Sequence, residues 1–335
     1  MNLIIPMAGM GKRMRPHTLT IPKPLIPVAG KPIVARLCED LAEVCDEKIN
    51  EIGFVLGRFG KAVAENLLAI AERLGAKGKI YYQNEALGTA HAILCAAPTL
   101  TGKTIVAFAD TLFKTQLHLD EEKDGILWVK QIEDPSQFGV VKLDENEVIT
   151  DYVEKPSTFV SDLAMIGIYY FKDGDTLKSE LQFLIDNQII KGGEYQLPDA
   201  LRNMTEKGTK FYPGKVDEWL DCGNKNATVF TNQRVLEIKK EKEQLISSSV
   251  KTHNSVIIEP CYIGENVEIL NSVIGPHVSI GDGTKIENAR VQNAILQTNC
   301  ILKNVNLENS MLGSYVQLEQ TPNQLSLSDY STSGI

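Results

Sequence analysis

Residues 8 to 24 hold the densest group of side chains that could bind an anion. The segment reads AGMGKRMRPHTLTIPKP and follows a short apolar run that is typical of a β-strand. Gly9 and Gly11 carry no Cβ, so backbone N–H groups can approach a phosphate closely at these positions. Arg13 and Lys23 add positive charge. We therefore expect a phosphate-binding loop at the carboxyl end of a first strand, where open α/β sheets bind their ligands.

Two familiar phosphate-binding motifs do not fit this spacing. A Walker loop needs Ser or Thr directly after Gly-Lys, but Gly11-Lys12 is followed by Arg13; a Rossmann fingerprint needs a third glycine at position 14, which is Met14. The pattern that remains is G-x-G-x-R followed by a Pro-Lys-Pro turn. It resembles the signature of the sugar-1-phosphate nucleotidylyltransferases, which join a nucleoside triphosphate and a sugar 1-phosphate into a nucleotide sugar.

The resemblance assigns roles to residues further along the chain. Asp110 ends an apolar strand and Asp221 lies in a Trp-Leu-Asp-Cys-Gly segment; the resemblance implies that both carboxylates bind Mg²⁺, an ion usually shared with phosphate oxygens. It also implies that Glu154 and Lys155, in a Glu-Lys-Pro triplet, bind the sugar and its phosphate. Gly139 matches the family's glycine against which the sugar packs.

The nucleotide is expected to contact two separate segments. The resemblance implies the following contacts: Ala8, Gly9, Gly11, Arg13, Gln83, Gly88 and Thr89. A glutamine amide offers one donor and one acceptor, which suits the imide edge of uracil or thymine, whereas guanine presents two adjacent donors and would favour a carboxylate. The sequence thus favours UTP or dTTP, with glucose 1-phosphate as the first choice of sugar. GTP with mannose 1-phosphate, or an amino sugar, remains open.

The expected reaction needs charge neutralisation more than proton transfer. A sugar phosphate is largely a dianion near neutral pH, so its oxygen can attack the α-phosphorus without a general base. Arg13, Lys23 and Asp110 are the expected catalytic residues, acting through positioning and electrostatics on an in-line displacement.

Composition points to an enzyme that acts on small molecules. The chain has 335 residues, 43% of them apolar, and a formal charge of −9, which argues against a nucleic-acid partner. It has no apolar run long enough to span a bilayer and no signal-peptide pattern. Six cysteines without a C-x-x-C pair indicate neither a zinc site nor a disulfide framework. We expect a cytoplasmic protein with no membrane partner.

The chain changes character near residue 228. Before it, strand and helix patterns alternate, which predicts an α/β, Rossmann-like, mixed and mostly parallel sheet. After it, Ile257, Ile263 and Ile269 begin a six-residue rhythm that resembles the left-handed β-helix of hexapeptide-repeat proteins. The expected divisions are a catalytic domain over 1–228, a helical linker over 229–249, the β-helix over 250–318 and a polar, poorly ordered tail over 319–335.

Two other classes of protein agree with parts of the sequence but not with all of it. A hexapeptide-repeat acyltransferase with a vestigial first domain is disfavoured, because roughly three coils of about 18 residues are few and no His or Asn stands in an extended loop. A non-catalytic regulator that binds nucleotide sugars would be expected to lose one of four charged residues, all of which are present: Arg13, Lys23, Asp110 and Asp221. By family analogy the β-helix is expected to serve assembly or regulation, in a homo-oligomer.

Overall fold

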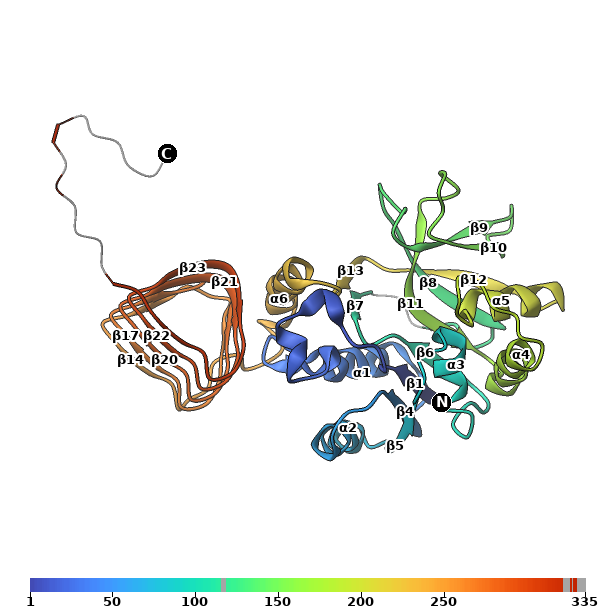
Figure 1. Ribbon diagram of the computed structural model, residues 1–335, viewed down its shortest axis with the longest axis horizontal. Coiled ribbons are helices and arrows are strands. Elements are labelled where there is room, and N and C mark those ends of the chain that lie inside the picture. The colour runs from blue at the N-terminus through green and yellow to red at the C-terminus, as the bar shows by residue number, and fades with distance from the viewer. Residues whose placement is uncertain (116–118, 322–325, 327, 330–335) are drawn as a thin grey trace. The chain divides into compact units, whose positions relative to one another are not determined.

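The contacts of the chain divide it into two units. The computed structural model describes residues 1–115, 119–321, 326 and 328–329 (Figure 1). The first unit, here called the α/β unit, comprises Met1–Ile26 and Lys31–Thr231; the second, the β-helix unit, comprises Pro27–Gly30 and Asn232–Ile335. Most of the tail expected over 319–335 lies outside the described residues.

The α/β unit is built on a nine-stranded sheet. Its main order is β10-β9-β11-β6-β1-β4-β5, and β8 joins it beside β11 with β12 at its other side. Strands β6, β1, β4 and β5 are parallel, whereas β11 runs antiparallel to β6, β8 and β9. The strands are β1 (Asn2–Pro6), β4 (Glu51–Leu56), β5 (Lys77–Tyr82), β6 (Thr104–Ala107), β8 (Gly125–Gln131), β9 (Gly139–Leu143), β10 (Ile149–Glu154), β11 (Leu163–Phe171) and β12 (Phe211–Lys215).

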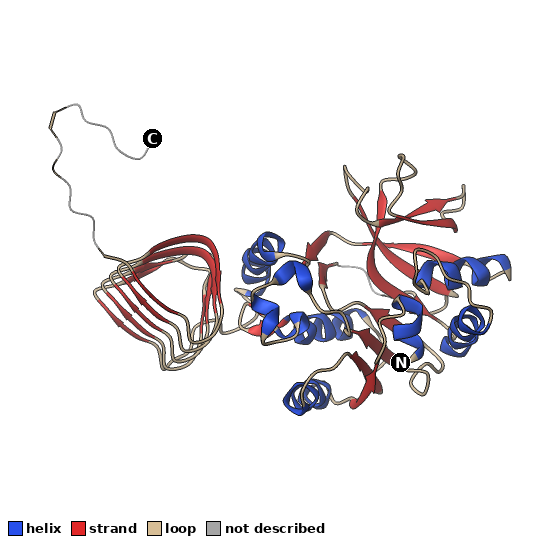
Figure 2. Cartoon of the chain, in the orientation of Figure 1, coloured by secondary structure: helices blue, strands red, loops and turns tan. Residues whose placement is uncertain are grey.

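Helices cover this sheet, as the alternating pattern predicts (Figure 2). The first two helices are α1 (Ile33–Val44) and α2 (Lys61–Arg73). Leu3, Ile4 and Ile5 of β1 are fully buried, as the continuous apolar run of a central parallel strand requires. The other helices are α3 (Thr89–Leu94), α4 (Gly174–Asp186), α5 (Leu197–Glu206) and α6 (Lys225–Lys239).

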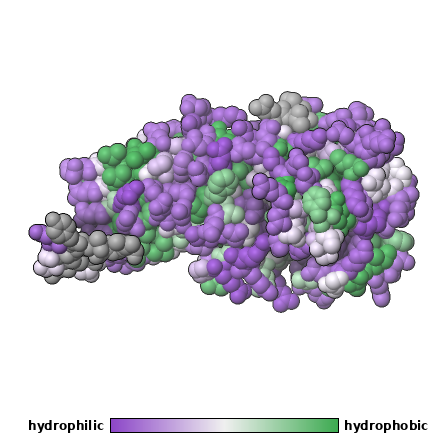
Figure 3. Space-filling view, turned by 90° about the horizontal axis from the view of Figure 1, so that it is seen from above, coloured by the Kyte–Doolittle hydropathy of each residue, from purple (hydrophilic) through white to green (hydrophobic). Residues whose placement is uncertain are grey.

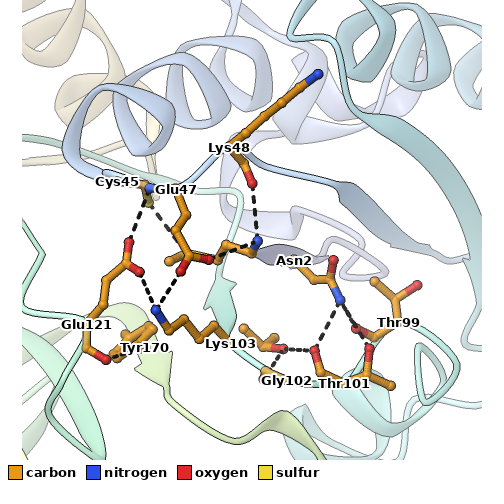
Figure 4. Close-up of polar contacts among 12 residues, drawn as sticks. Asn2, Cys45, Glu47, Lys48, Thr99, Thr101, Gly102, Lys103, Glu121 and Tyr170 are labelled. Atoms are coloured by element: carbon orange, nitrogen blue, oxygen red, sulfur yellow. Dashed lines mark hydrogen bonds and ion pairs between the residues drawn. The ribbon is translucent and has the colours of Figure 1, made fainter.

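A polar network fixes the amino ends of β1 and β6 (Figure 4). The Lys103 ammonium lies 2.6 Å from a Glu47 oxygen and 2.8 Å from a Glu121 oxygen. The Asn2 side-chain amide donates to the backbone oxygens of Thr99 and Thr101, at 3.1 and 3.2 Å. These contacts join the amino ends of β1 and β6 to each other and to the segments around Glu47 and Glu121.

The β-helix unit consists of short parallel strands stacked in register, which confirms the predicted β-helix. One sheet holds β14, β17, β20, β22 and β24, and a second holds the remaining strands of the unit. The bounds are β14 (Lys251–His253), β15 (Val256–Ile257), β16 (Tyr262–Ile263), β17 (Glu268–Leu270), β18 (Val273–Ile274), β19 (Val278–Ile280), β20 (Lys285–Glu287), β21 (Arg290–Leu296), β22 (Ile301–Lys303), β23 (Asn306–Leu312) and β24 (Gln317–Glu319).

Asparagines at one corner of the β-helix set the length of a coil. Asn254, Asn271, Asn288 and Asn304 all have φ near +50°, a left-handed conformation that Asn tolerates better than other residues with a Cβ. Each side-chain amide donates to the next, at 2.9, 3.2 and 3.2 Å, over sequence separations of 17, 17 and 16 residues. A coil therefore takes 16 or 17 residues, not the expected 18, because some steps between inward-facing aliphatic residues are five residues long instead of six, as from Ile269 to Ile274.

A hairpin from the amino-terminal part of the chain belongs to the β-helix unit. The backbone N–H of Ala29 donates to Asn232 Oδ1 at 2.9 Å, and the Ser279 hydroxyl donates to the same oxygen at 2.6 Å. Gly30 has φ +82°, and a Cβ at this position would lie 2.1 Å from the Tyr262 ring. The hairpin is formed by β2 (Pro27–Val28) and β3 (Lys31–Pro32), and its turn requires glycine at position 30.

Within the part of the chain that the structure describes, no helix is long and apolar enough to cross a bilayer. On the face shown in Figure 3, hydrophilic and hydrophobic residues are interspersed.

Candidate active site

A cavity of about 430 Å³ lies at the carboxyl ends of β1, β5 and β6. It brings together the segment 8–24 and the segment after β5, which are distant in the sequence. Its lining includes these residues predicted from the sequence: Ala8, Gly9, Gly11, Arg13, Lys23, Gln83, Gly88, Thr89 and Asp110. Lys12 lines the same cavity, together with Phe108 and Glu194.

The signature loop folds back on itself through short 3-10 turns. Gly11 has φ +56°, and the Thr18 hydroxyl donates to its backbone oxygen at 2.9 Å. A Cβ on Gly11 would lie 3.0 Å from the side chains of both Lys23 and Thr18. The second glycine of the motif therefore serves to let the two ends of the loop meet, which places Lys23 next to the residues that precede Arg13.

Lys23 and Asp110 form an ion pair inside the cavity. The ammonium lies 2.8 Å from Asp110 Oδ2, and Lys23 is only 8% exposed. Asp110 follows β6, and the signature loop follows β1, which is the neighbour of β6 in the sheet. The strand order thus explains why two residues 87 positions apart meet.

The second predicted carboxylate, Asp221, is brought to Asp110 by a two-stranded sheet. Strand β13 (Glu218–Asp221) pairs with β7 (Thr111–Lys114), Asp221 opposite Thr111, and the Cys222 N–H donates to the Asp110 backbone oxygen at 2.9 Å. Burial, followed by the negative charge of Asp110, raises the pKa of Asp221 above its ordinary value; Lys23 and Arg13 act in the opposite direction. Asp221 Oδ1 accepts from the N–H of Gly223, a residue of the cavity wall.

The carboxylates of Asp110 and Asp221 are suitable ligands for a divalent cation such as Mg²⁺. They repel each other, and a cation between them would relieve that repulsion. Within the described residues no three or more His, Cys, Asp or Glu side chains gather in a metal-binding group. Mg²⁺ commonly takes one or two protein carboxylates and completes its shell with water and substrate phosphates, so a pair suffices.

The far end of the cavity is shaped by the turn after β5. The Gln83 N–H donates to Leu56 O at 2.8 Å and so extends the sheet by one residue. Gly88 has φ +104°, and a Cβ there would lie 2.4 Å from Tyr195 O, so only glycine fits. The Thr89 hydroxyl accepts from the Leu197 N–H at 3.0 Å. Thr89 therefore holds the start of α5 as well as lining the cavity.

A second cavity, of about 710 Å³, adjoins the first and shares Thr89, Phe108 and Glu194 with it. Glu154 and Lys155, the predicted sugar-phosphate residues, both line it. Burial raises the pKa of Glu154, and the Lys155 ammonium, 3.9 Å from the carboxylate, offsets part of this effect.

Gly139 lies beside the second cavity and is absent from the described lining of both. It is buried and pairs with Glu154 across β9 and β10. A Cβ on Gly139 would lie 2.5 Å from the Met165 side chain and 2.7 Å from Glu154 Oε2. The structure thus places this glycine against the Glu154 carboxylate, where a Cβ would leave too little space, and the predicted contact with the sugar stays a prediction.

Sequence analysis missed a charged group in the second cavity. Asp199 Oδ1 accepts from the Lys191 ammonium at 2.5 Å and from Arg202 Nη1 at 2.9 Å. Arg202 Nη2 also donates to Tyr152 O at 2.6 Å. Asp199 and Arg202 are three apart on α5, a spacing that brings side chains together on one face. That signal was in the sequence, but no helix had been predicted there.

The chain belongs to the nucleotidyl transferase family, which matches residues 3–238. It is similar to the low-salt glycan biosynthesis nucleotidyltransferase Agl11 of Haloferax volcanii, with 29% identity over 314 residues covering 86% of this chain and 85% of the relative. It is also similar to a glucose-1-phosphate thymidylyltransferase of Streptomyces griseus, with 25% identity covering 100% and 99%. Within the family, the chain is a sugar-1-phosphate nucleotidylyltransferase.

A solved structure has the same fold. It is a UDP-glucose pyrophosphorylase complexed with UDP-glucose, which matches with a TM-score of 0.58 and 24% identity and covers 71% of this chain and 98% of that one. This likeness concerns the fold alone.

Proposed function

We propose that the enzyme transfers a nucleotidyl group from dTTP or UTP to glucose 1-phosphate and releases pyrophosphate. The supporting observation is the pair of adjoining cavities. One is lined by the basic signature loop, Gln83 and Asp110; the other is lined by Glu154 and Lys155. A triphosphate in the first and a sugar phosphate in the second would bring the attacking oxygen next to the α-phosphorus.

The reaction then follows from the charges of the residues that line the two cavities. A phosphate oxygen of the sugar phosphate forms a bond to the α-phosphorus, and the bond from that phosphorus to the bridging oxygen breaks, so pyrophosphate leaves in line. Arg13 and Lys23 neutralise the triphosphate, and Lys155 orients the sugar phosphate. Lys23 pairs with Asp110 in the free protein and exchanges part of that contact for the triphosphate.

We assign Asp110 and Asp221 as the residues that would hold Mg²⁺. When bound, the ion would supply positive charge at the phosphate oxygens and help to orient them. The protein's own part is to keep both carboxylates at the edge where β6 and β13 end, beside the cationic loop.

The choice of nucleotide and sugar rests on Gln83 and on the relatives. Gln83 lines the first cavity at the end where the base is expected. Its carbonyl oxygen can accept the N3–H that uracil and thymine share, and it could equally accept the N1–H of guanine, so the choice of a pyrimidine over guanine rests on the relatives. The Streptomyces griseus relative is named for glucose 1-phosphate and a thymidylyl group. Mannose 1-phosphate with GTP is the alternative that the same site geometry would serve.

The test is pyrophosphate release from glucose 1-phosphate with each nucleoside triphosphate in turn, in Mg²⁺ and again with a chelator. We expect release with dTTP or UTP that the chelator abolishes. Release with GTP alone would overturn the base assignment. Unchanged release in the chelator would overturn the Mg²⁺ assignment, and no release with a panel of sugar phosphates would favour a nucleotide-sugar-binding regulator.

We propose in addition that the protein is a homo-oligomer assembled through the β-helix unit. Val256 on β15 and Val273 on β18 lie side by side on neighbouring parallel strands. The two residues are 56% and 38% exposed, so neighbouring coils present apolar surface to the solvent. Light scattering on the whole chain should give a multiple of the 37.0 kDa chain mass. A mass equal to one chain at micromolar concentration would refute the proposal.

A further inference from the structure

The side-chain amide of Gln83 is held at two points by its own segment. Its Nε2 atom donates to Gly88 O at 3.0 Å and lies 3.1 Å from Nδ1 of His91. His91 is on α3, one turn beyond Gly88, and is half-buried. A primary amide has two N–H groups, so these two contacts use both of its donors.

The backbone carbonyl of Gly88 determines the orientation of the Gln83 side-chain amide. Gly88 O already accepts from the Ala92 N–H at 3.1 Å, and Gly88 itself is confined by the close approach of Tyr195. A carbonyl oxygen cannot donate, so the Gln83 atom that faces it must be the nitrogen. The reversed amide would place two oxygens against each other.

The same geometry fixes the state of His91. Since Gln83 donates, His91 Nδ1 must accept, and the ring proton then lies on Nε2. Burial lowers the pKa of His91 below its ordinary value, against a smaller opposing effect of Glu85. This shift favours the neutral ring, in which the Nδ1 lone pair can accept from Gln83.

We infer that His91 is a positioning residue for nucleobase recognition: it occupies the second amide donor of Gln83, so that Gln83 presents only its carbonyl oxygen to the base. This rests on the proposed function, in which Gln83 contacts the base. A site that offers only a hydrogen-bond acceptor recognises an N–H donor on the base, such as the N3–H group of uracil and thymine. Cytosine has a lone pair at N3, which would meet the lone pairs of the Gln83 oxygen, so CTP should be rejected.

Two nearly isosteric substitutions separate this role from packing. In His91→Leu a methyl group replaces the Nδ1 acceptor, whereas in His91→Asn an amide oxygen can take its place. For His91→Leu we expect KM for the preferred pyrimidine nucleotide to rise about tenfold, with kcat nearly unchanged, and the preference over CTP to fall about tenfold, the effect of about one hydrogen bond. The KM for the sugar 1-phosphate should not change.

His91→Asn should keep the wild-type preference. The inference is overturned if His91→Leu keeps both the KM and the preference over CTP, or if His91→Asn loses as much as His91→Leu. If His91→Leu does not fold, nitrogen NMR of the unmodified protein decides: an unprotonated Nδ1 coupled to a Gln83 amide proton supports the inference, and a protonated Nδ1 at neutral pH overturns it. Inactivity of the wild type with all nucleotides would refute the proposed function, and the NMR result would still decide the geometry.

Discussion

Replacing Asp110 by asparagine is expected to reduce turnover by about a thousandfold, equivalent to about 4 kcal/mol of transition-state stabilisation. Asparagine preserves the shape of the side chain and an acceptor for Lys23, but it removes one of the two charges that would hold Mg²⁺. The measurement is kcat for pyrophosphate release at saturating substrates, with calorimetric titration of Mn²⁺ as a second readout. KM for the sugar 1-phosphate should stay within a few-fold of wild type.

The matched control is Asp217→Asn, which makes the same chemical change at an exposed position four residues before Asp221. This variant should keep wild-type activity and the same melting temperature. Near wild-type turnover of Asp110→Asn would show that this carboxylate is not needed for the reaction, even though it lies beside Lys23 in the cavity.

Replacing Arg13 by alanine is the second change with a large expected effect, a loss of about 10²- to 10³-fold in kcat/KM for the nucleotide. Arg13 is exposed in the free protein and lines the nucleotide cavity, so its removal should cost little folding stability. Arg13→Lys should recover only part of the activity, because an ammonium lacks the planar fork of donors that matches a phosphate.

Arg73→Ala serves as the control for charge removal, since Arg73 is exposed at the end of α2. Its activity should equal that of wild type. If Arg13→Ala and Arg73→Ala behaved alike, the cation in the signature loop would have no part in binding the triphosphate.

The parts of the site that the sequence predicted are those set by local chemistry. Gly9, Gly11 and Arg13 follow β1 within a few residues, and Asp110 follows the neighbouring strand β6, so strand order alone brings them to one edge of the sheet. Glu154 and Lys155 could likewise be read from a short motif, and both line the second cavity.

The parts that the sequence did not predict depend on contacts between distant segments. Lys191, Asp199 and Arg202 meet on and beside a helix whose apolar pattern was too short to recognise. The donor and acceptor of Gln83 were both expected to face the base, but Gly88 and His91 occupy the donor. No property of the residue type alone shows which of its hydrogen-bonding groups the fold already uses.

The first strand and turn of the hairpin, residues 27–30, limit how this protein can exchange its carboxyl-terminal part with a relative. Ala29 and Gly30 are fitted to Asn232, Ser279 and Tyr262, so the β-helix unit is encoded by two stretches of sequence about 200 residues apart. Recombination at a single point after α6 would keep the contact between Ala29 and Asn232, but the foreign β-helix would lack the Ser279 hydroxyl that donates to Asn232 and the Tyr262 ring that packs at Gly30. Inherited or engineered swaps should therefore succeed when the four hairpin residues travel with the β-helix.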